Sequence, residues 1–99
     1  MMEDEVFIPK EARLQYLERR KKDLVTLREN LNEKKDDEFK RIGHQLKGNA
    51  STFGFLDLEK IAINLEKVGE SKNWAEAETQ LKLFENWISV ESGKASQYK

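Results

Sequence analysis

The chain has 99 residues, of which 37% are hydrophobic and 37% are charged. This length suits one domain with one core, and the balance is typical of helices that each bury one face and expose a charged one. The net charge of -1 lacks the basic excess that nucleic-acid binding needs, and the absence of cysteine excludes disulfides and cysteine metal sites. We therefore expect a single domain over residues 1–99 that binds no nucleic acid.

The N-terminus is acidic and no apolar run follows it, which is unlike a secretory signal. No stretch of the sequence approaches the length of a membrane span. These features predict a soluble, cytoplasmic protein without a membrane partner.

Apolar residues recur at helical spacing along most of the chain, and they predict four helices. The first helix is predicted over residues 9–31, beginning at Pro9, with leucines 14, 17, 24, 27 and 31 on its buried side. The second is predicted over residues 36–53, where Asp36 or Asp37 caps its start and Gly54 follows its end.

The third helix is predicted over residues 57–70, with Asp57 as its cap and its apolar stripe at Leu58, Ile61, Leu65 and Val68. The fourth is predicted over residues 74–91 and starts after Asn73, which forms an Asn-x-x-Glu capping box with Glu76. Its stripe consists of Trp74, Ala77, Leu81, Phe84 and Ile88. The connections are short, so the predicted fold is all-α, an antiparallel up-down four-helix bundle.

The second helix carries the residues with chemical potential. Each helical residue rotates by about 100°, which places His44 roughly 160° from the middle of the apolar stripe. His44 is the sole histidine of the chain and is expected to face solvent. Its neighbours on the same side are Lys47 and Gly48, one turn further along, and Lys40 and Arg41, one turn back.

A glycine inside a helix costs about 1 kcal/mol relative to alanine, and this helix contains two. Gly43 lies toward the core flank, where it allows close packing of a neighbouring helix. Gly48 lies on the outward face, where its missing side chain lets a partner approach the imidazole. Each residue alone has an ordinary surface or packing explanation, but their combination around one exposed histidine indicates a functional site.

The segment from His44 to Phe55 reads His-Gln-Leu-Lys-Gly-Asn-Ala-Ser-Thr-Phe-Gly-Phe. It resembles the signature of histidine phosphotransfer domains, His-x-Leu-Lys-Gly-x-Ala-x-x-x-Gly, at every specified position. The Thr-Phe-Gly-Phe ending is similar to the phosphotransfer domain of chemotaxis histidine kinases. This resemblance implies that His44 accepts a phosphoryl group.

The resemblance also implies roles for residues near His44. Lys47 matches the family lysine that faces the phosphoryl oxygens, and Lys40 and Arg41 are expected to add to the positive field. Glu66, in a Leu-Glu pair of the third helix, matches the residue that accepts a hydrogen bond from the second ring nitrogen; the alternative is an ordinary surface glutamate. Some relatives carry a second histidine where this chain has Ile63.

A partner is expected to dock on the face around His44. The predicted docking residues are Lys40, Arg41, Gly48, Ser51, Phe55 and Ile63. The implied partners are a response-regulator receiver domain and a histidine kinase or hybrid kinase. The chain itself is expected to be a monomer and to bind no metal or cofactor, with Mg²⁺ held by the receiver.

We expect a phosphocarrier without independent catalysis, because the sequence contains no phosphate-binding loop of the kind a kinase needs. The alternative is a helical module that docks receiver domains but carries no phosphate. The intact combination of His44, Lys47 and Gly48 favours the phosphocarrier.

Overall fold

Four α-helices make up the part of the chain that the structure describes. The computed structural model describes residues 8–96. The helices are α1 (Lys10–Glu33), α2 (Asp37–Phe53), α3 (Leu56–Ser71) and α4 (Trp74–Ser96). No strand occurs within the described range, and the prediction of an all-helical fold is confirmed.

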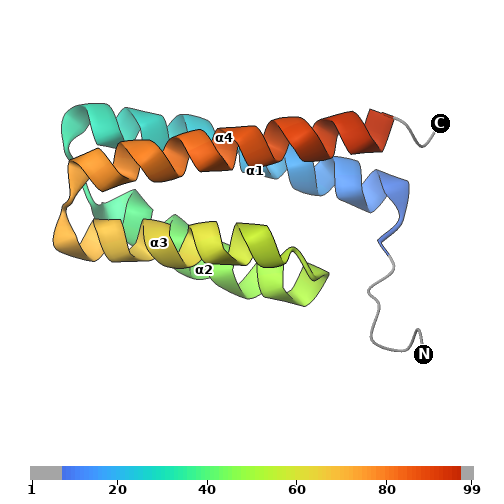
Figure 1. Cartoon of the computed structure of the whole chain (residues 1–99), viewed down its shortest axis with the longest axis horizontal. Helices are drawn as coiled ribbons and strands as arrows, with labels where there is room; N and C mark the ends of the chain where they lie inside the picture. The colour runs from blue at the N-terminus through green and yellow to red at the C-terminus, as the bar shows by residue number, and fades with distance from the viewer. Residues whose placement is uncertain (1–7, 97–99) are drawn as a thin grey trace.

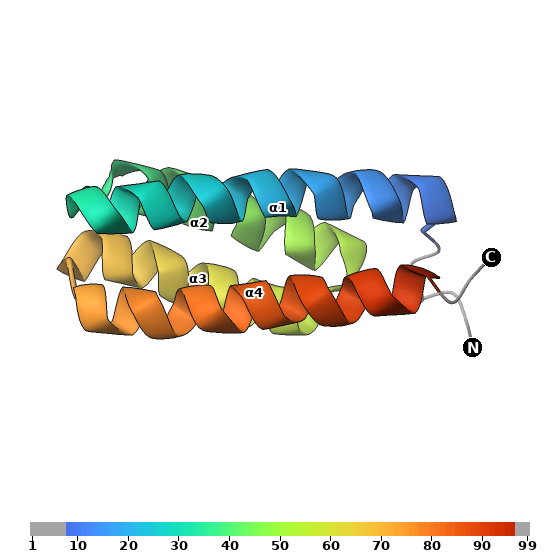
Figure 2. The same ribbon diagram turned by 90° about the horizontal axis from the view of Figure 1, so that it is seen from above.

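The helices pack in two neighbouring pairs. Figures 1 and 2 show α1 beside α4 and α2 beside α3, with the α1–α4 pair extending past the shorter pair at the end where α1 begins and α4 ends. Backbone contacts join α1 to α2, α2 to α3, α3 to α4 and α4 to α1, whereas α2 and α4 lie diagonally without a close backbone contact. Each helix therefore has an inner side facing the core and an outer side facing solvent.

The core is built from the apolar stripes of all four helices. Its largest fully buried side chains are Leu27, Phe39, Leu46, Leu58, Leu65, Leu81 and Phe84. The leucine stripe predicted for the first helix is wrong at Leu14, which is 41% exposed. The buried face of α1 instead includes Tyr16 and Arg20, and it is therefore rotated away from Leu14.

Arg20 is buried because its guanidinium finds both an aromatic and an acidic partner. Its guanidinium lies over the ring of Tyr16, 4.4 Å from the centroid, and its Nε donates to Asp23 Oδ2 at 2.8 Å. The hydroxyl of Tyr16 donates to Asn49 Oδ1 on α2 at 2.6 Å. Burial raises the pKa of Tyr16, so this hydroxyl keeps its proton and α1 is tied to α2 by a neutral hydrogen bond.

Two helices end at lysines in the left-handed conformation rather than at a glycine. Lys34 has φ 58°, and its backbone N–H donates to the carbonyl oxygens of Asn30 and Leu31. Lys72 has φ 59° and closes α3 by donating to Val68. The αL cap lets α1 run past the predicted end at residue 31.

The predicted starts and ends of the last two helices need correction. Phe55 precedes the first residue of α3, so Asp57 lies in the first turn and is not the cap. α4 continues to Ser96, beyond the predicted end at residue 91. The buried Glu91 stabilises this extension, because it pairs with Arg13 of α1 at 3.5 Å and with Lys94 at 3.1 Å.

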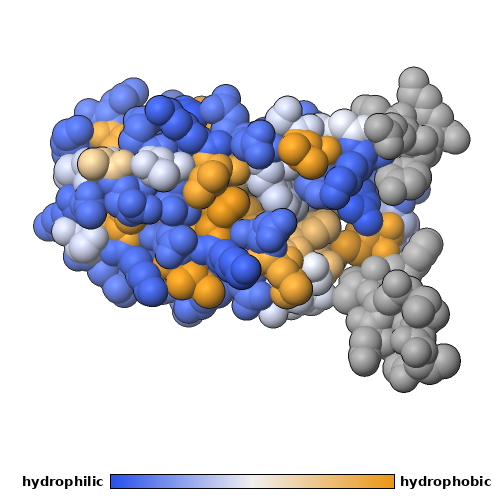
Figure 3. Space-filling view, viewed as in Figure 1, coloured by the Kyte–Doolittle hydropathy of each residue, from blue (hydrophilic) through white to orange (hydrophobic). Residues whose placement is uncertain are grey.

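The face formed by α3 and α4 combines charged and apolar surface. Figure 3 shows apolar residues gathered near the middle of this face among hydrophilic ones. Leu83 and Val90 are exposed there and line a groove together with Ile61 and Trp87.

No helix in the described part of the chain is long and apolar enough to cross a bilayer. The cytoplasmic location stays a prediction.

Asn73 directly precedes α4, and its replacement by alanine tests how much this cap contributes. Its Oδ1 accepts a hydrogen bond from Glu76 N at 3.1 Å. The return contact of a full capping box is missing, since the Asn73 N–H donates to Ser71 Oγ at 3.3 Å and the Glu76 carboxylate accepts from Gln80. Asn73→Ala should lower the free energy of unfolding by about 1 kcal/mol. Asn86→Ala, at an exposed position inside the same helix, should change it little. Urea denaturation of both variants checks this, and equal losses would contradict the capping role.

Candidate functional site

His44 lies on the outer side of α2 with its side chain 72% exposed. It is held there because the opposite side of the helix is fixed in the core by Phe39, Ile42, Leu46 and Ala50. The helical phase therefore predicts the orientation of the ring correctly. An imidazole in this position is open to a macromolecular partner.

Glu66 of α3 reaches across to α2 and contacts two of its residues. Its Oε2 lies 3.3 Å from Nδ1 of His44, and its Oε1 accepts a hydrogen bond from Nζ of Lys47 at 3.0 Å. The structure thus brings the histidine, the lysine and the glutamate into one cluster from two helices. The two oxygens of one carboxylate serve both partners.

The electrostatics of this cluster favour an ionised Glu66. The hydrogen bond from Lys47 is the main cause that holds the pKa of the Glu66 carboxyl below its ordinary value, and the contact with His44 acts in the same direction. Partial burial opposes these effects and is outweighed. A carboxylate next to Nδ1 favours the imidazole tautomer with its proton on Nδ1, which leaves the lone pair on Nε2.

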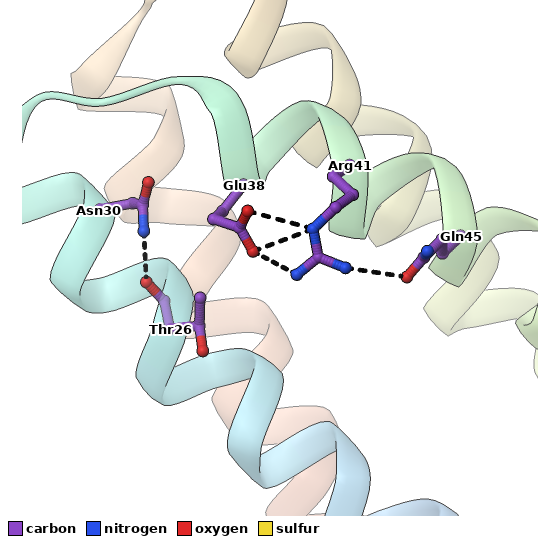
Figure 4. Close-up of polar contacts among 5 residues, drawn as sticks. All are labelled: Thr26, Asn30, Glu38, Arg41 and Gln45. Carbon is purple, nitrogen blue, oxygen red and sulfur yellow. Dashed lines mark hydrogen bonds and ion pairs between the residues drawn. The ribbon is translucent and has the colours of Figure 1, made fainter.

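Lys40 and Arg41 already have acidic partners, in the residue that caps α2 and in its first turn. Lys40 Nζ lies 2.7 Å from Asp36 Oδ2. Arg41 binds Glu38, three residues back, and donates to Gln45 Oε1 at 3.3 Å; Figure 4 shows this line of side chains along α2. The positive field expected from these two residues is therefore largely neutralised by acidic residues at the start of α2.

These acidic partners were not predicted from the sequence, although their spacing indicates them. Asp36 precedes Lys40 by four positions and Glu38 precedes Arg41 by three, the separations at which side chains meet on a helix. The hydrogen bond from Lys40 lowers the pKa of Asp36, and the hydrogen bond from Arg41 lowers that of Glu38. Both carboxyls are therefore charged near neutral pH.

The surface next to His44 is open at Gly48. A Cβ atom built on Gly48 would have no neighbouring atom within 4 Å. Ser51, one turn further along α2, is also exposed. A partner approaching along this side of the helix meets little obstruction beside the imidazole.

Phe55 and Ile63 are both half-buried, but their surroundings differ. The Phe55 ring packs inside the bundle, 5.3 Å from Tyr16 and 5.2 Å from Trp87 between centroids, and the Arg13 guanidinium lies 5.8 Å above it. Ile63 lies on α3 outside the buried stripe of that helix. The ring of Phe55 thus packs against residues of this chain. Docking of a partner through Phe55 stays a prediction.

No group of three or more His, Asp or Glu side chains that could hold a metal ion occurs in the described residues. The expectations that the chain binds no metal and no cofactor remain predictions.

Comparison with known protein families gives one result. A family model described as the Hpt domain matches residues 11–90, a span that includes all of α2 and α3. The search of curated proteins and the search of solved structures found no match.

The lowered pKa of Glu66 gives a prediction for Lys47→Ala. Removal of the lysine should raise the Glu66 pKa toward the ordinary value of 4.5, because the largest stabilisation of the carboxylate is lost. The folded-state pKa is depressed, so the pair stabilises the fold above the pKa of an unfolded glutamate, and this contribution is lost as the pH falls through the lower folded pKa.

The ¹³C chemical shift of the Glu66 carboxyl, followed as a function of pH, measures this change. Lys40→Ala is the matched control, since that lysine pairs with Asp36 and should leave the Glu66 titration in place. A Glu66 titration that is identical with and without Lys47 would contradict the ion pair.

Proposed function

Because the chain belongs to the Hpt domain family, whose activity is histidine phosphotransfer in two-component signalling, we propose that His44 is its phosphoryl acceptor. The proposed partner is the aspartate of a response-regulator receiver domain, which gives the phosphoryl group to His44 or receives it. The observation that carries this proposal is the exposed imidazole of His44 with its Nδ1 atom 3.3 Å from the Glu66 carboxylate.

The proposed transfer uses Nε2 as the nucleophile. With the proton on Nδ1, the Nε2 lone pair attacks the phosphorus of the aspartyl phosphate in line. An N–P bond forms, the acyl P–O bond breaks, and the aspartate leaves as a carboxylate. The ring becomes positively charged, and the adjacent Glu66 carboxylate stabilises that charge without taking the proton.

Lys47 is the proposed source of positive charge for the phosphoryl oxygens. Its ammonium is held by Glu66 at 3.0 Å and its side chain is 39% exposed, so it has room to turn toward a group on Nε2. Phosphoryl transfer depends mainly on positioning and charge stabilisation, which is the role proposed for this lysine.

The docking face in this proposal surrounds His44. It comprises Gly48 and Ser51 on α2 and Ile63 on α3, with Lys40 and Arg41 at its edge as charges shared with their acidic neighbours. The donor is proposed to be a histidine kinase or hybrid kinase. Mg²⁺ belongs to the receiver in this scheme, and a monomeric carrier satisfies it.

The proposed topology of the bundle is antiparallel and up-down. In Figure 1 the α1–α2 and α3–α4 connections lie at one end of the molecule and the α2–α3 connection lies at the other, which supports this order. An up-down bundle leaves the outer side of α2 free of crossing connections, as partner access requires.

His44→Gln should abolish labelling of the chain by a phosphorylated receiver or an autophosphorylated kinase. The variant removes the sole histidine from an exposed site, so the core should be unaffected. Lys82→Gln, an exposed change on α4, is the control and should label like the parent. The label on the parent should be acid-labile and alkali-stable.

Two outcomes would contradict the phosphocarrier. Undiminished labelling of His44→Gln would move the phosphate to another residue. A parent that binds receivers yet never acquires label would favour the alternative, a docking module that carries no phosphate.

Gly48→Gln should change stability and transfer in opposite directions. It should raise the free energy of unfolding by up to about 1 kcal/mol, because a helical glycine is replaced where the added Cβ meets nothing. It should slow phosphotransfer, because the new side chain fills the approach to His44. Thermal unfolding and the initial rate of labelling measure the two effects.

Gly93→Gln is the matched control for this pair of effects. It is also a helical glycine in open space, but it lies on α4, which has no close backbone contact with α2. It should stabilise the fold and leave the transfer rate unchanged. If Gly48→Gln transfers phosphate as fast as the parent, the open space beside His44 is incidental.

A further inference from the structure

We propose that Gly43 is a positioning residue that sets the spacing between α2 and α3 at which Glu66 reaches His44. The inference rests on the proposed function for its consequence in phosphotransfer, and on geometry alone for its effect on the imidazole. Gly43 precedes His44 directly and is buried against α3.

The backbone of α3 occupies the place where a side chain of residue 43 would lie. A Cβ atom on Gly43 would be 2.7 Å from Glu66 N, 2.9 Å from Glu66 Cα and 3.1 Å from Ala62 O. Ordinary contact with a Cβ begins at about 3.4 Å, and these three neighbours are backbone atoms, which cannot rotate away as the end of a side chain can. Any side chain at residue 43 must therefore push α3 outward.

This close approach coincides with the residue that bears the carboxylate. The α3 backbone that touches Gly43 is that of Glu66, and the Glu66 side chain contacts the two residues of α2 that matter most to the proposal. Both of its oxygens are used, one at 3.3 Å from His44 Nδ1 and the other at 3.0 Å from Lys47 Nζ. A shift of the Glu66 backbone cannot preserve both distances without compensating changes on α2.

A second glycine, on α3, allows the same two helices to approach closely at another point along their length. A Cβ on Gly69 of α3 would lie 2.8 Å from Lys40 Cγ and 2.9 Å from Lys40 N. The close approach of the two helices thus depends on one glycine from each, Gly43 of α2 and Gly69 of α3. Only Gly43 faces the backbone of Glu66, so Gly43 is the one whose substitution moves the carboxylate directly.

The two contacts of Glu66 differ in how much separation they tolerate. The contact with His44 is near the 3.5 Å limit of a hydrogen bond, and the imidazole is fixed on a short side chain. Lys47 has a long, flexible side chain that can follow a displaced carboxylate. A wider spacing should therefore break the contact with His44 while the ion pair with Lys47 persists.

Gly43→Ala tests this inference through the tautomer of His44. The ¹⁵N shifts of Nδ1 and Nε2, measured in alkaline buffer, report which ring nitrogen carries the proton. In Gly43→Ala they should move most of the way to the values found in Glu66→Ala. The Glu66 pKa should stay below its ordinary value, because Lys47 remains its partner. Gly93→Ala, a helical glycine in open space, should match the parent in both measurements.

Glu66→Asp provides the second test and leaves the helix spacing unaltered. It shortens the side chain by one methylene, so the carboxylate should fall short of His44 and the tautomer should change as in Gly43→Ala. Parent-like ¹⁵N shifts in a folded Gly43→Ala would overturn the proposal. If Gly43→Ala does not fold, parent-like shifts in Glu66→Asp would overturn it, since reach would then not limit the contact.

The tautomer readout separates this inference from the proposed function. An unchanged tautomer in Gly43→Ala, with normal labelling of parent His44, removes the positioning role and leaves phosphotransfer standing. A changed tautomer in a chain whose His44 never accepts label removes phosphotransfer and leaves the helix-spacing effect standing.

Discussion

Glu66 stands on α3 yet makes its polar contacts with α2, where its oxygens lie 3.3 Å from His44 Nδ1 and 3.0 Å from Lys47 Nζ. A cluster shared between two helices exists only at one helix spacing, and that spacing is set by backbone packed against Gly43. The core on the inner side of α2 and α3 holds both helices in register. The packing of α2 against α3 in the core and the contacts of Glu66 with His44 and Lys47 on the outer side therefore depend on the same helix spacing.

The basic side chains on the outer side of α2 are each paired with a carboxylate. Lys40, Arg41 and Lys47 each have a carboxylate partner, so the face around His44 presents paired charges rather than a strong positive field. Exposed ion pairs add little to stability, typically less than about 1 kcal/mol each. These pairs hold their long side chains against α2 and α3, and the space beside Gly48 is open.

The sequence predicted the helices and the orientation of His44, because both follow from the 3.6-residue period of apolar residues. Periodicity did not predict the burial of Arg20, since a charged residue enters the core only where Tyr16 and Asp23 supply partners, and those come together on folding. It also missed the helix ends at Lys34 and Lys72, because an αL cap on a lysine has no glycine to mark it. Local sequence signals thus determine where the helices lie, whereas the burial of a charged residue such as Arg20 depends on partners that meet it only in the folded protein.

The position of Glu66 lies between these two cases. The apolar stripe predicted for the third helix does not include Glu66, but its pairing with His44 was predicted from the resemblance to a family and not from the helical period. What the sequence could not give was the distance between the two helices, which depends on how far their backbones approach. The sequence predicted that Gly43 allows close packing of a neighbouring helix, but it did not show that the neighbouring backbone is that of Glu66, which became clear only from the position of α3.

The electrostatic balance of the cluster explains why a carboxylate can stand beside a site proposed to carry phosphate. Two like unit charges about 4 Å apart repel by about 1 kcal/mol in water and by about 4 kcal/mol at an effective dielectric constant of about 20. An unpaired Glu66 would therefore oppose an incoming phosphoryl dianion while it stabilised the imidazolium. Lys47 removes this conflict, because its ammonium lies on the same carboxylate and cancels its charge toward the partner. The glutamate can then hold Nδ1 through a short-range contact while the cluster as a whole does not repel phosphate.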